Sequence, residues 1–342
     1  MPTRYFGFKK ESSFGEEAAG GSKYDLTIAD TVSLDIPDDA IIELPSLSPF
    51  QEGHIPGYYA PEGSFEYPVD VKTVPHFLYF LLGGYTFTAG SSGGGKNKHE
   101  FYATESTFLP SFTARVGKDS YEHVFVGCVL QKASLEVEDA VTMMKTDIVA
   151  RKDKKAEIRT DLNEPGPVWP IAYHHVTVTF GEGAGATDYT SYVQSFSLEY
   201  DNGVKEDYGR GFGSRFPYMY MTGEKSCEMS LELRPIGPDQ QYIDQDFLER
   251  VWGAEDGVSE DSTAVSEKVT VVFDAGTAGT MTMVAPQAYI SKLDTSYKGA
   301  EARTLSMDMK CEMGTVTLAD GSTTKKTPLY VKVESDEGQV TK

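Results

Sequence analysis

The stretch that decides the fold is Phe196-Ser197-Leu198-Glu199-Tyr200, in which apolar and polar residues alternate at every position. Val32-Ser33-Leu34-Asp35-Ile36 alternates in the same way, and so do residues 135–138, 229–233 and 305–309. A period of two is typical of a strand with one buried and one solvated face. Residues 176–180 and 269–273 add runs rich in β-branched side chains, which also favour strands. The sequence therefore predicts a mainly β protein.

Two segments have helical signals instead. Residues 74–82 have proline at an early position and are followed by Gly83-Gly84, a pattern that marks the beginning and end of a helix. Residues 238–252 begin with Pro238-Asp239 and are followed by Gly253, and the acid suits the positive end of a helix dipole. We expect one helix in each half of the chain.

Composition limits the classes of function. The chain has 342 residues, of which 39% are hydrophobic and 12% aromatic, which fits a globular protein of two domains. No apolar run reaches the roughly 18 residues that span a bilayer, and residues 1–5 lack the apolar core of a secretory signal. The net charge of -21 argues against wrapping nucleic acid, but it is compatible with an acidic wall past which nucleic acid slides. Solubility in high salt is the alternative meaning of this charge.

The residues give no sign of catalysis. Cys128, Cys227 and Cys311 are far apart and form no Cys-x-x-Cys pair, so we interpret them as small buried hydrophobes. The adjacent histidines His174-His175 would point to opposite faces of a strand and could not easily share a metal. The acids alternate along strands and form a solvated face, without the apolar pocket that an acid–base pair needs. We expect no enzyme activity, catalytic residue, metal site or cofactor.

The same elements occur twice in the same order and at nearly the same spacing. The matches align residues 32–40 with 196–204, Gly63 with Gly223, Phe77 with Phe247, Lys132 with Lys292, and Asp147 with Asp308. Each match is weak alone, but the shared order and spacing predict a tandem duplication. Each half then consists of a strand, a loop, a strand, a helix, a loop and further strands.

The charged and Pro/Gly-rich residues 152–167 are the predicted boundary between the halves. We therefore expect domains at residues 22–164 and 165–314. Residues 1–21 and 315–342 have no counterpart in the repeat and are predicted to be an N-terminal and a C-terminal arm. Within the first, Arg4, Tyr5, Phe6 and Phe8 are candidates for packing on a neighbouring subunit or ring, and docking on their own domain is the open alternative.

One series of motifs resembles a known family. PGYYAPEGS (residues 56–64) leads into FEYPVD (65–70) and then into the helix that ends in LLGGY (81–85), and FVGCVL (125–130) and LEV (135–137) follow. This series resembles the tail tube proteins of long-tailed, non-contractile viruses of bacteria and archaea, over about residues 22–313 and more loosely in the second half. The resemblance implies two tandem tail-tube-like domains, each a β-sandwich or partial barrel with one flanking helix.

The resemblance also implies a function. It points to a structural virion protein, the major tail tube subunit, which polymerises into stacked rings that form the channel for viral DNA delivery. The duplication points to trimeric rings with pseudo-sixfold symmetry, with a hexamer as the alternative. The implied partners are other copies of the chain and the terminator, tape measure and distal tail proteins. The implied location is the virion tail, assembled in the host cytoplasm, with no membrane. The alternative from another class is a carbohydrate-binding or adhesin-type β-sandwich surface protein.

The acids of the alternating strands are candidates for the channel wall. Period-two geometry places them opposite their apolar neighbours. We expect Glu136 and Glu138 to face the lumen, and Asp35, Glu199, Asp308 and Glu312 are further lumen candidates. An acidic lumen would repel phosphate, so the viral DNA would pass through without specific binding. The alternative is that these acids form an ordinary solvated outer face.

Overall fold

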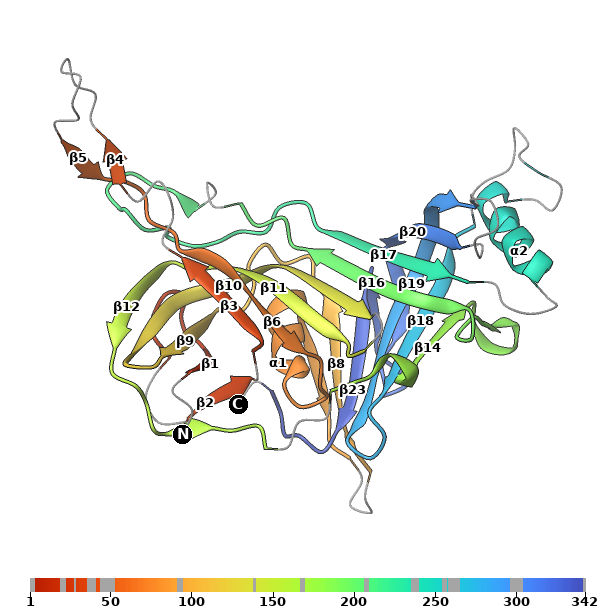
Figure 1. Cartoon of the computed structure of the whole chain (residues 1–342), viewed down its shortest axis with the longest axis horizontal. Coiled ribbons are helices and arrows are strands. Elements are labelled where there is room, and N and C mark those ends of the chain that lie inside the picture. The colour runs from red at the N-terminus through yellow and green to blue at the C-terminus, as the bar shows by residue number, and fades with distance from the viewer. Residues whose placement is uncertain are drawn as a thin grey trace.

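The computed structural model describes residues 4–18, 23–27, 29–35, 41–43, 53–90, 95–137, 140–166, 170–205, 209–234, 240–253, 257, 265–295 and 304–340. Strands dominate these residues, and the helices they contain are short, so the predicted mainly β fold is confirmed. The molecule is elongated, with the first half of the chain at one end and most of the second half at the other (Figure 1).

A single antiparallel sheet, called here the inner sheet, runs through both halves. The first half contributes β3 (Thr31–Asp35), β6 (Glu62–Pro68), β11 (Met143–Val149) and the second part of β10 (Tyr121–Val137), in that order. The second half continues with β16 (Val193–Asp201), β17 (Ser226–Leu233), β20 (Leu305–Glu312) and the second part of β19 (Gly279–Asp294). The halves join where β10 pairs with β16.

Outer sheets cover one face of the inner sheet. In the first half, β1 (Arg4–Lys10), β9 (Phe112–Lys118), the first part of β10 and β12 (Lys152–Ala156) pair in that order. In the second half, β14 (Val176–Phe180), β18 (Glu267–Asp274), the first part of β19 and β23 (Tyr330–Ser335) pair in that order. Both long strands, β10 and β19, therefore belong to an outer and to the inner sheet. The molecule is a pair of sandwiches joined through a shared layer.

Shorter strands complete the sheets. β2 (Tyr24–Thr27) pairs with β1, and β13 (Leu162–Asn163) pairs with β2. β7 (Gly83–Thr88) pairs with β8 (Asn97–Ala103), and β8 pairs with β23, which makes a second junction between the halves. The remaining strands are β4 (Ile41–Glu43), β5 (His54–Pro56), β15 (Thr187–Asp188), β21 (Gly314–Thr317) and β22 (Thr324–Thr327).

β10 passes from one sheet to the other at Gly127. This residue has a positive φ of 71°, and the pairing of β10 with β9 changes register between Phe125 and Cys128. A Cβ atom at Gly127 would lie 2.8 Å from the Cβ of Arg151. Glycine is therefore needed here both for its backbone conformation and for its small size.

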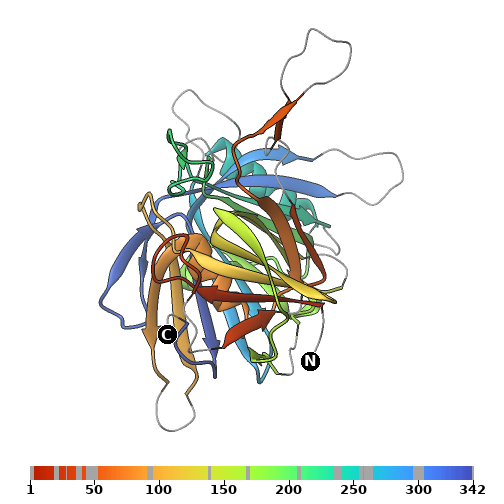
Figure 2. The same ribbon diagram turned by 90° about the vertical axis from the view of Figure 1, so that its left-hand side faces the viewer.

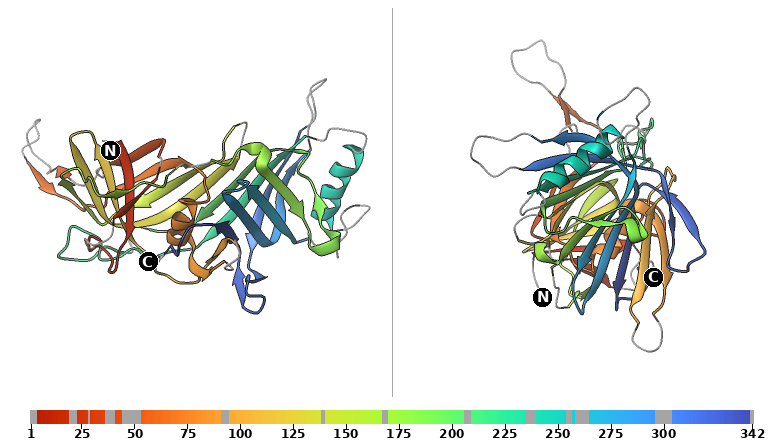
Figure 3. Two further views of the ribbon diagram at one scale, coloured as in Figure 1. Left: turned by 90° about the horizontal axis from the view of Figure 1, so that it is seen from below. Right: turned by 90° about the vertical axis from the view of Figure 1, so that its right-hand side faces the viewer.

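The helices lie where the sequence predicts them. α1 (Val74–Leu82) has Pro75 in its first turn and ends at Gly83, which has a positive φ of 79°. Its Phe77 packs against Phe65 of β6 and Phe8 of β1, so α1 fills the space between the inner and outer sheets. α2 (Gln240–Trp252) lies at the far end of the second half, and its Phe247 packs against Phe180 of β14 (Figure 3).

The two halves have the same pairing pattern, down to the residue. Across the first half, Ser33, Ser64, Asp147 and Lys132 lie opposite one another on successive strands. Across the second half, Ser197, Ser230, Asp308 and Lys292 do the same. The register shifts next to Lys132 in β10 and next to Lys292 in β19, so the same irregularity occurs at the same place. The strand β3 is thus equivalent to β16, β6 to β17, β11 to β20, and β10 to β19.

One of the predicted matches is wrong. Gly63 lies opposite Ile148 of β11, whereas Gly223 precedes β17. The residue opposite Met309, the equivalent of Ile148, is Met229, so Met229 is the true counterpart of Gly63. The match by glycine identity failed because the connections between strands differ in length while the strand registers do not.

The predicted arms contain strands of the chain's own sheets. β1 pairs with β9, and Phe6 and Phe8 are fully buried in the core of their own chain. This is the arrangement that the alternative of docking on their own domain expects, and contact with a neighbouring subunit stays a prediction. Arg4 forms an exposed ion pair with Asp119, and the Tyr5 hydroxyl donates to the buried Glu122. In residues 315–342, β23 lies between β19 and β8. By their place in the outer sheets, β1 is equivalent to β14 and β23 is equivalent to β12. The two predicted arms therefore contain strands with counterparts in the repeat, although their sequences are not alike.

Candidate functional site

The polar face of the inner sheet holds the predicted acids. Glu136, Glu199, Asp308 and Glu312 are exposed on this face, because their neighbours along each strand point into the core. Asp35 occupies the matching strand position, opposite Glu62. Glu138 lies outside the described residues. The structure thus brings five of the six lumen candidates to one sheet, and whether this face lines a channel stays a prediction.

The same face also carries lysines, which the sequence-based prediction of an acidic wall did not include. The face carries Lys132, Lys145, Lys292 and Lys310, and among the described strands the acids outnumber them: Glu62, Glu66, Glu136, Asp147, Glu199, Asp201, Glu228, Glu232, Asp294, Asp308 and Glu312. The sequence could have predicted these lysines, because each is separated from an acid of its own strand by an even number of residues and so points to the same face. The face is therefore acidic overall, with cations interspersed.

Ion pairs link neighbouring strands of this face. Lys132 lies 2.7 Å from Glu199, Lys310 lies 3.6 Å from Glu228, and Lys292 lies 3.9 Å from Asp308. The Lys132–Glu199 pair crosses the junction between the halves, and the hydrogen bond to Glu199 raises the pKa of Lys132. Burial raises the pKa of Asp147, and the negative charges of Asp201 and Glu199 add to this effect, against Lys145 and Lys132. Negative charge is thus crowded at this junction.

One end of the polar face is covered. The connection between β16 and β17 is described at residues 202–205 and 209–225, and these parts extend from the second half across the end of β10 and β11 (Figure 1). Its Val204 and Tyr220 form a small apolar cluster with Val129 and Val149. The Tyr220 hydroxyl donates to the carbonyl of Ala150 at 2.8 Å, and the Arg151 guanidinium donates to the carbonyl of Pro217 at 3.0 Å. This connection therefore fastens the second half onto the first.

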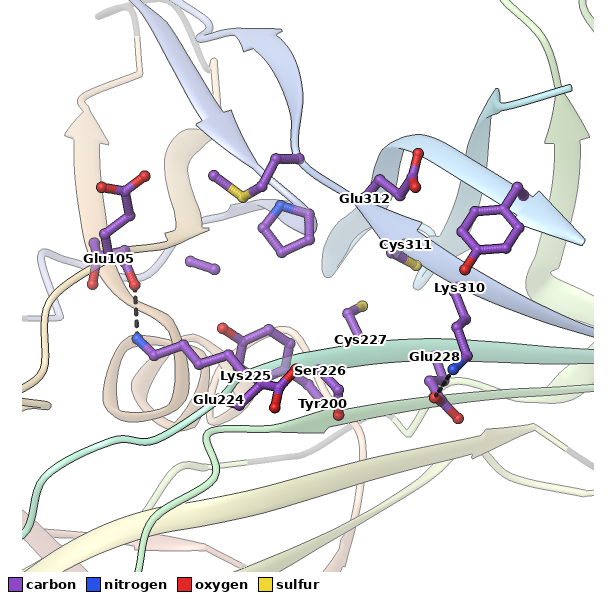
Figure 4. A pocket seen from close by; sticks show the side chains of 15 residues that line it. Glu105, Tyr200, Glu224, Lys225, Ser226, Cys227, Glu228, Lys310, Cys311 and Glu312 are labelled. Carbon is purple, nitrogen blue, oxygen red and sulfur yellow. Dashed lines mark hydrogen bonds and ion pairs between the residues drawn. The ribbon is translucent and has the colours of Figure 1, made fainter. Parts of the chain in front are cut away.

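A pocket of about 580 Å³ lies at the corresponding end of the second half (Figure 4). Its lining includes Tyr200, Cys227, Tyr289, Lys310, Cys311 and Glu312. Cys227 on β17 and Cys311 on β20 lie side by side, and contact with Cys311 and burial raise the pKa of the Cys227 thiol. The sequence alone predicts two separate buried cysteines, because it does not show that β17 and β20 are neighbouring strands.

The connection between β3 and β6 projects from the body of the molecule. Its described part includes the hairpin of β4 and β5, in which Ile42 lies opposite Ile55 (Figure 2). Ile41, Ile42 and Ile55 are 60%, 48% and 45% exposed. An apolar side chain that is half exposed is common, but three on one short hairpin form a patch that calls for an explanation.

Among the described residues, no cluster of three or more His, Cys, Asp or Glu side chains is arranged to hold a metal ion. The helices in that part of the chain are too short or too polar to cross a membrane.

No curated protein is similar enough in sequence to serve as a named relative. A family model described as phage tail tube protein matches residues 3–235, which include every strand from β1 to β17. The match covers well over half of the chain and includes the inner-sheet strands of the first half, the junction and the covering connection. The chain therefore belongs to the phage tail tube protein family.

Proposed function

We propose that this protein is the major tail tube subunit of a long-tailed virus, and that three copies close head to tail into a ring. Stacked rings then form the channel for viral DNA. The family match supports a tail tube role over the alternative of a carbohydrate-binding surface protein.

The observation that carries the proposal is the junction between β10 and β16. Their pairing runs from Lys132 opposite Asp201 to Val137 opposite Phe196. β19 is equivalent to β10, and β3 is equivalent to β16. In the described residues, β19 beyond Pro286 pairs with β20, and β3 pairs with β6, so these strands are the outermost members of the inner sheet. Pairing β19 of one copy with β3 of the next would repeat a contact that the chain already makes within itself.

The inner sheet has one face that is packed against other elements and one polar face, and only the polar face is available to line a channel. The other face is packed against the outer sheets and α1, with side chains such as Phe65, Leu135 and Met307 buried there. If the inner sheets of a ring close into a cylinder with the outer sheets inside it, the outer sheets fill the channel. If the outer sheets lie outside the cylinder, the acidic polar face surrounds an open channel that repels DNA phosphates.

Two tandem halves per chain and three chains give six similar positions around the ring, which is the basis for the proposed trimer. The further partners are the terminator, tape measure and distal tail proteins at the ends of the tube. The proposed location is the virion tail, after assembly in the host cytoplasm.

The test is electron microscopy of the purified chain together with native mass measurement. The proposal expects rings or tubes with a mass of three chains per ring. A protein that stays monomeric at high concentration and in the presence of tail initiation proteins contradicts the proposal. Rings of six chains contradict the trimer but leave the tube role intact.

A further inference from the structure

We propose that the pocket beside Cys311 is the seat for the β4–β5 hairpin of the next copy in the ring. The proposal rests on the proposed head-to-tail ring. It names a second surface of that contact, separate from the pairing of β19 with β3.

The chain contains one example of this contact. The β16–β17 connection leaves the inner sheet, crosses the junction and covers the end of the preceding half, where Tyr220 joins Val129 and Val149 in one apolar cluster. Its backbone is also held by this half, since the Tyr59 amide donates to the carbonyl of Arg215 at 2.8 Å. A connection that follows β16 thus covers the half whose β10 pairs with β16.

The pocket is the equivalent surface of the second half. Val129 lies opposite Val149, and Tyr289 lies opposite Lys310, at the same place in the repeat. Ala150 and Arg151 follow Val149 as Cys311 and Glu312 follow Lys310. The covered set Val129, Val149, Ala150 and Arg151 therefore corresponds to Tyr289, Lys310, Cys311 and Glu312, and all four of these residues line the pocket.

The hairpin is the equivalent of the covering segment. β3 is equivalent to β16, so the β3–β6 connection of residues 36–61 corresponds to residues 202–225 and has nearly the same length. Tyr220 precedes Glu228 by the same number of residues as His54 precedes Glu62, the equivalent of Glu228. Tyr220 follows Glu199 by the same number of residues as Pro56 follows Asp35, the equivalent of Glu199. The position of Tyr220 thus falls on β5, whose central residue is the exposed Ile55.

The two surfaces are complementary in character and are kept apart within one chain. The hairpin presents Ile41, Ile42 and Ile55, and the pocket offers the ring of Tyr289, with the half-buried Cys311 beside it. The hairpin projects at the end of the molecule opposite to α2 (Figures 1 and 3). A chain cannot use its own hairpin in the way that it uses Tyr220, because β3 is at the far edge of the inner sheet from β19. Only the next copy brings the two surfaces together.

The native pocket thiols allow a direct test. Assembled rings of Ile55→Cys chains are treated with diamide, which takes up the two electrons and two protons released when two thiols form a disulfide. We expect covalent dimers and trimers on a non-reducing gel, and peptide mapping should join residue 55 to Cys311 or Cys227. The triple variant Ile55→Cys, Cys227→Ser, Cys311→Ser should form no such product. Phe212→Cys, at a fully exposed site on the covering connection of the same chain, is the matched control.

The outcomes separate this inference from the ring itself. Rings with the expected cross-link support both proposals. Rings that form normally but give no cross-link, with diamide or with a short bis-maleimide, overturn the hairpin contact and leave the tube role intact. If Ile55→Cys chains fold but no longer form rings while Phe212→Cys chains do, the hairpin contributes to the contact. A chain that forms no ring even as wild type contradicts the proposed function.

Discussion

The ammonium group of Lys132 lies 2.7 Å from the carboxylate of Glu199, across the junction between the two halves of the chain. Lys292 has the same position as Lys132 in the repeat, and Asp35 has the same position as Glu199. Lys292 is 74% exposed, compared with 34% for Lys132. In a ring that repeats the internal junction, Lys292 of one copy meets Asp35 of the next.

Reversing the charge of Lys292 should therefore weaken ring formation and change the stability of the subunit only slightly, because its pair with Asp308 in the same chain is long, at 3.9 Å, and exposed. An exposed ion pair contributes about 0.2–1 kcal/mol, and its replacement by two like charges adds repulsion of similar size. We expect Lys292→Glu to weaken each contact about fivefold, measured as the concentration at which rings form. The second change Asp35→Lys should restore assembly, whereas the exposed control Lys326→Glu should have no effect. Failure of the double variant to recover assembly would contradict this register of β19 against β3.

The first strand should be essential for folding. Phe8 is 1% exposed and packs against Phe77 of α1, so Phe8→Ala leaves a cavity between the sheets. We expect a loss of about 3–5 kcal/mol in the free energy of unfolding, measured by urea denaturation. Phe212→Ala, at an exposed ring, should change it by less than about 0.5 kcal/mol. Unchanged stability of Phe8→Ala with loss of assembly would favour the arm role instead.

His99 should make the junction between β8 and β23 sensitive to acid. Its ring is fully buried, with Nδ1 3.1 Å from the Tyr85 hydroxyl and Nε2 3.2 Å from the carbonyl of Glu337. Burial lowers the pKa of His99 below its usual 6.5, and the nearby His76 lowers it further, against the hydrogen bond to Glu337. The folded state therefore favours the neutral ring. The stability that the neutral His99 ring contributes is complete above pH 6.5 and is lost as the pH falls through the lowered pKa.

His99→Gln should flatten this decline. Urea denaturation at pH 7.5 and 5.5 measures it, and the exposed His174→Gln is the control. An equal loss of stability in His99→Gln and in the wild type would assign the acid sensitivity to other groups.

Lysines on the polar face should retard DNA. In tubes that carry Glu136→Lys with Glu232→Lys, phosphate contacts become favourable at low salt. We expect slower DNA ejection from assembled particles at low salt and recovery as salt is raised. Glu157→Lys, which follows β12 at the edge of an outer sheet, should leave ejection unchanged. If the double variant assembles and ejects DNA at the normal rate in low salt, the polar face does not line the channel.

Local patterns predicted the elements that depend on neighbouring residues. Residues 196–200 alternate and form part of β16, in which Phe196, Leu198 and Tyr200 are buried. A period of two places these three side chains on one face of the strand. α1 begins and ends at the predicted residues, since proline and glycine act within a single turn. These signals require no knowledge of the tertiary fold.

Long-range pairing was beyond such patterns. Phe6 and Phe8 are buried because β1 pairs with β9, whose residues lie more than a hundred positions further along the chain. The central position of β23 depends on β8 and β19, which come from different halves. The pocket with Cys227 and Cys311 requires the register of β17 against β20. The short sequence of each of these strands is compatible with many partners, so their pairing became visible only in the structure.

In the proposed ring, the junction between β10 and β16 is repeated between chains. The most direct measurement is a cryo-electron microscopy map of assembled tubes at a resolution that separates strands. We expect three chains per ring, β19 of each chain beside β3 of the next, and the β4–β5 hairpin seated over Cys311. A map in which β19 and β3 of adjacent copies do not pair would contradict the repeated junction, and a ring of six chains would contradict the trimer.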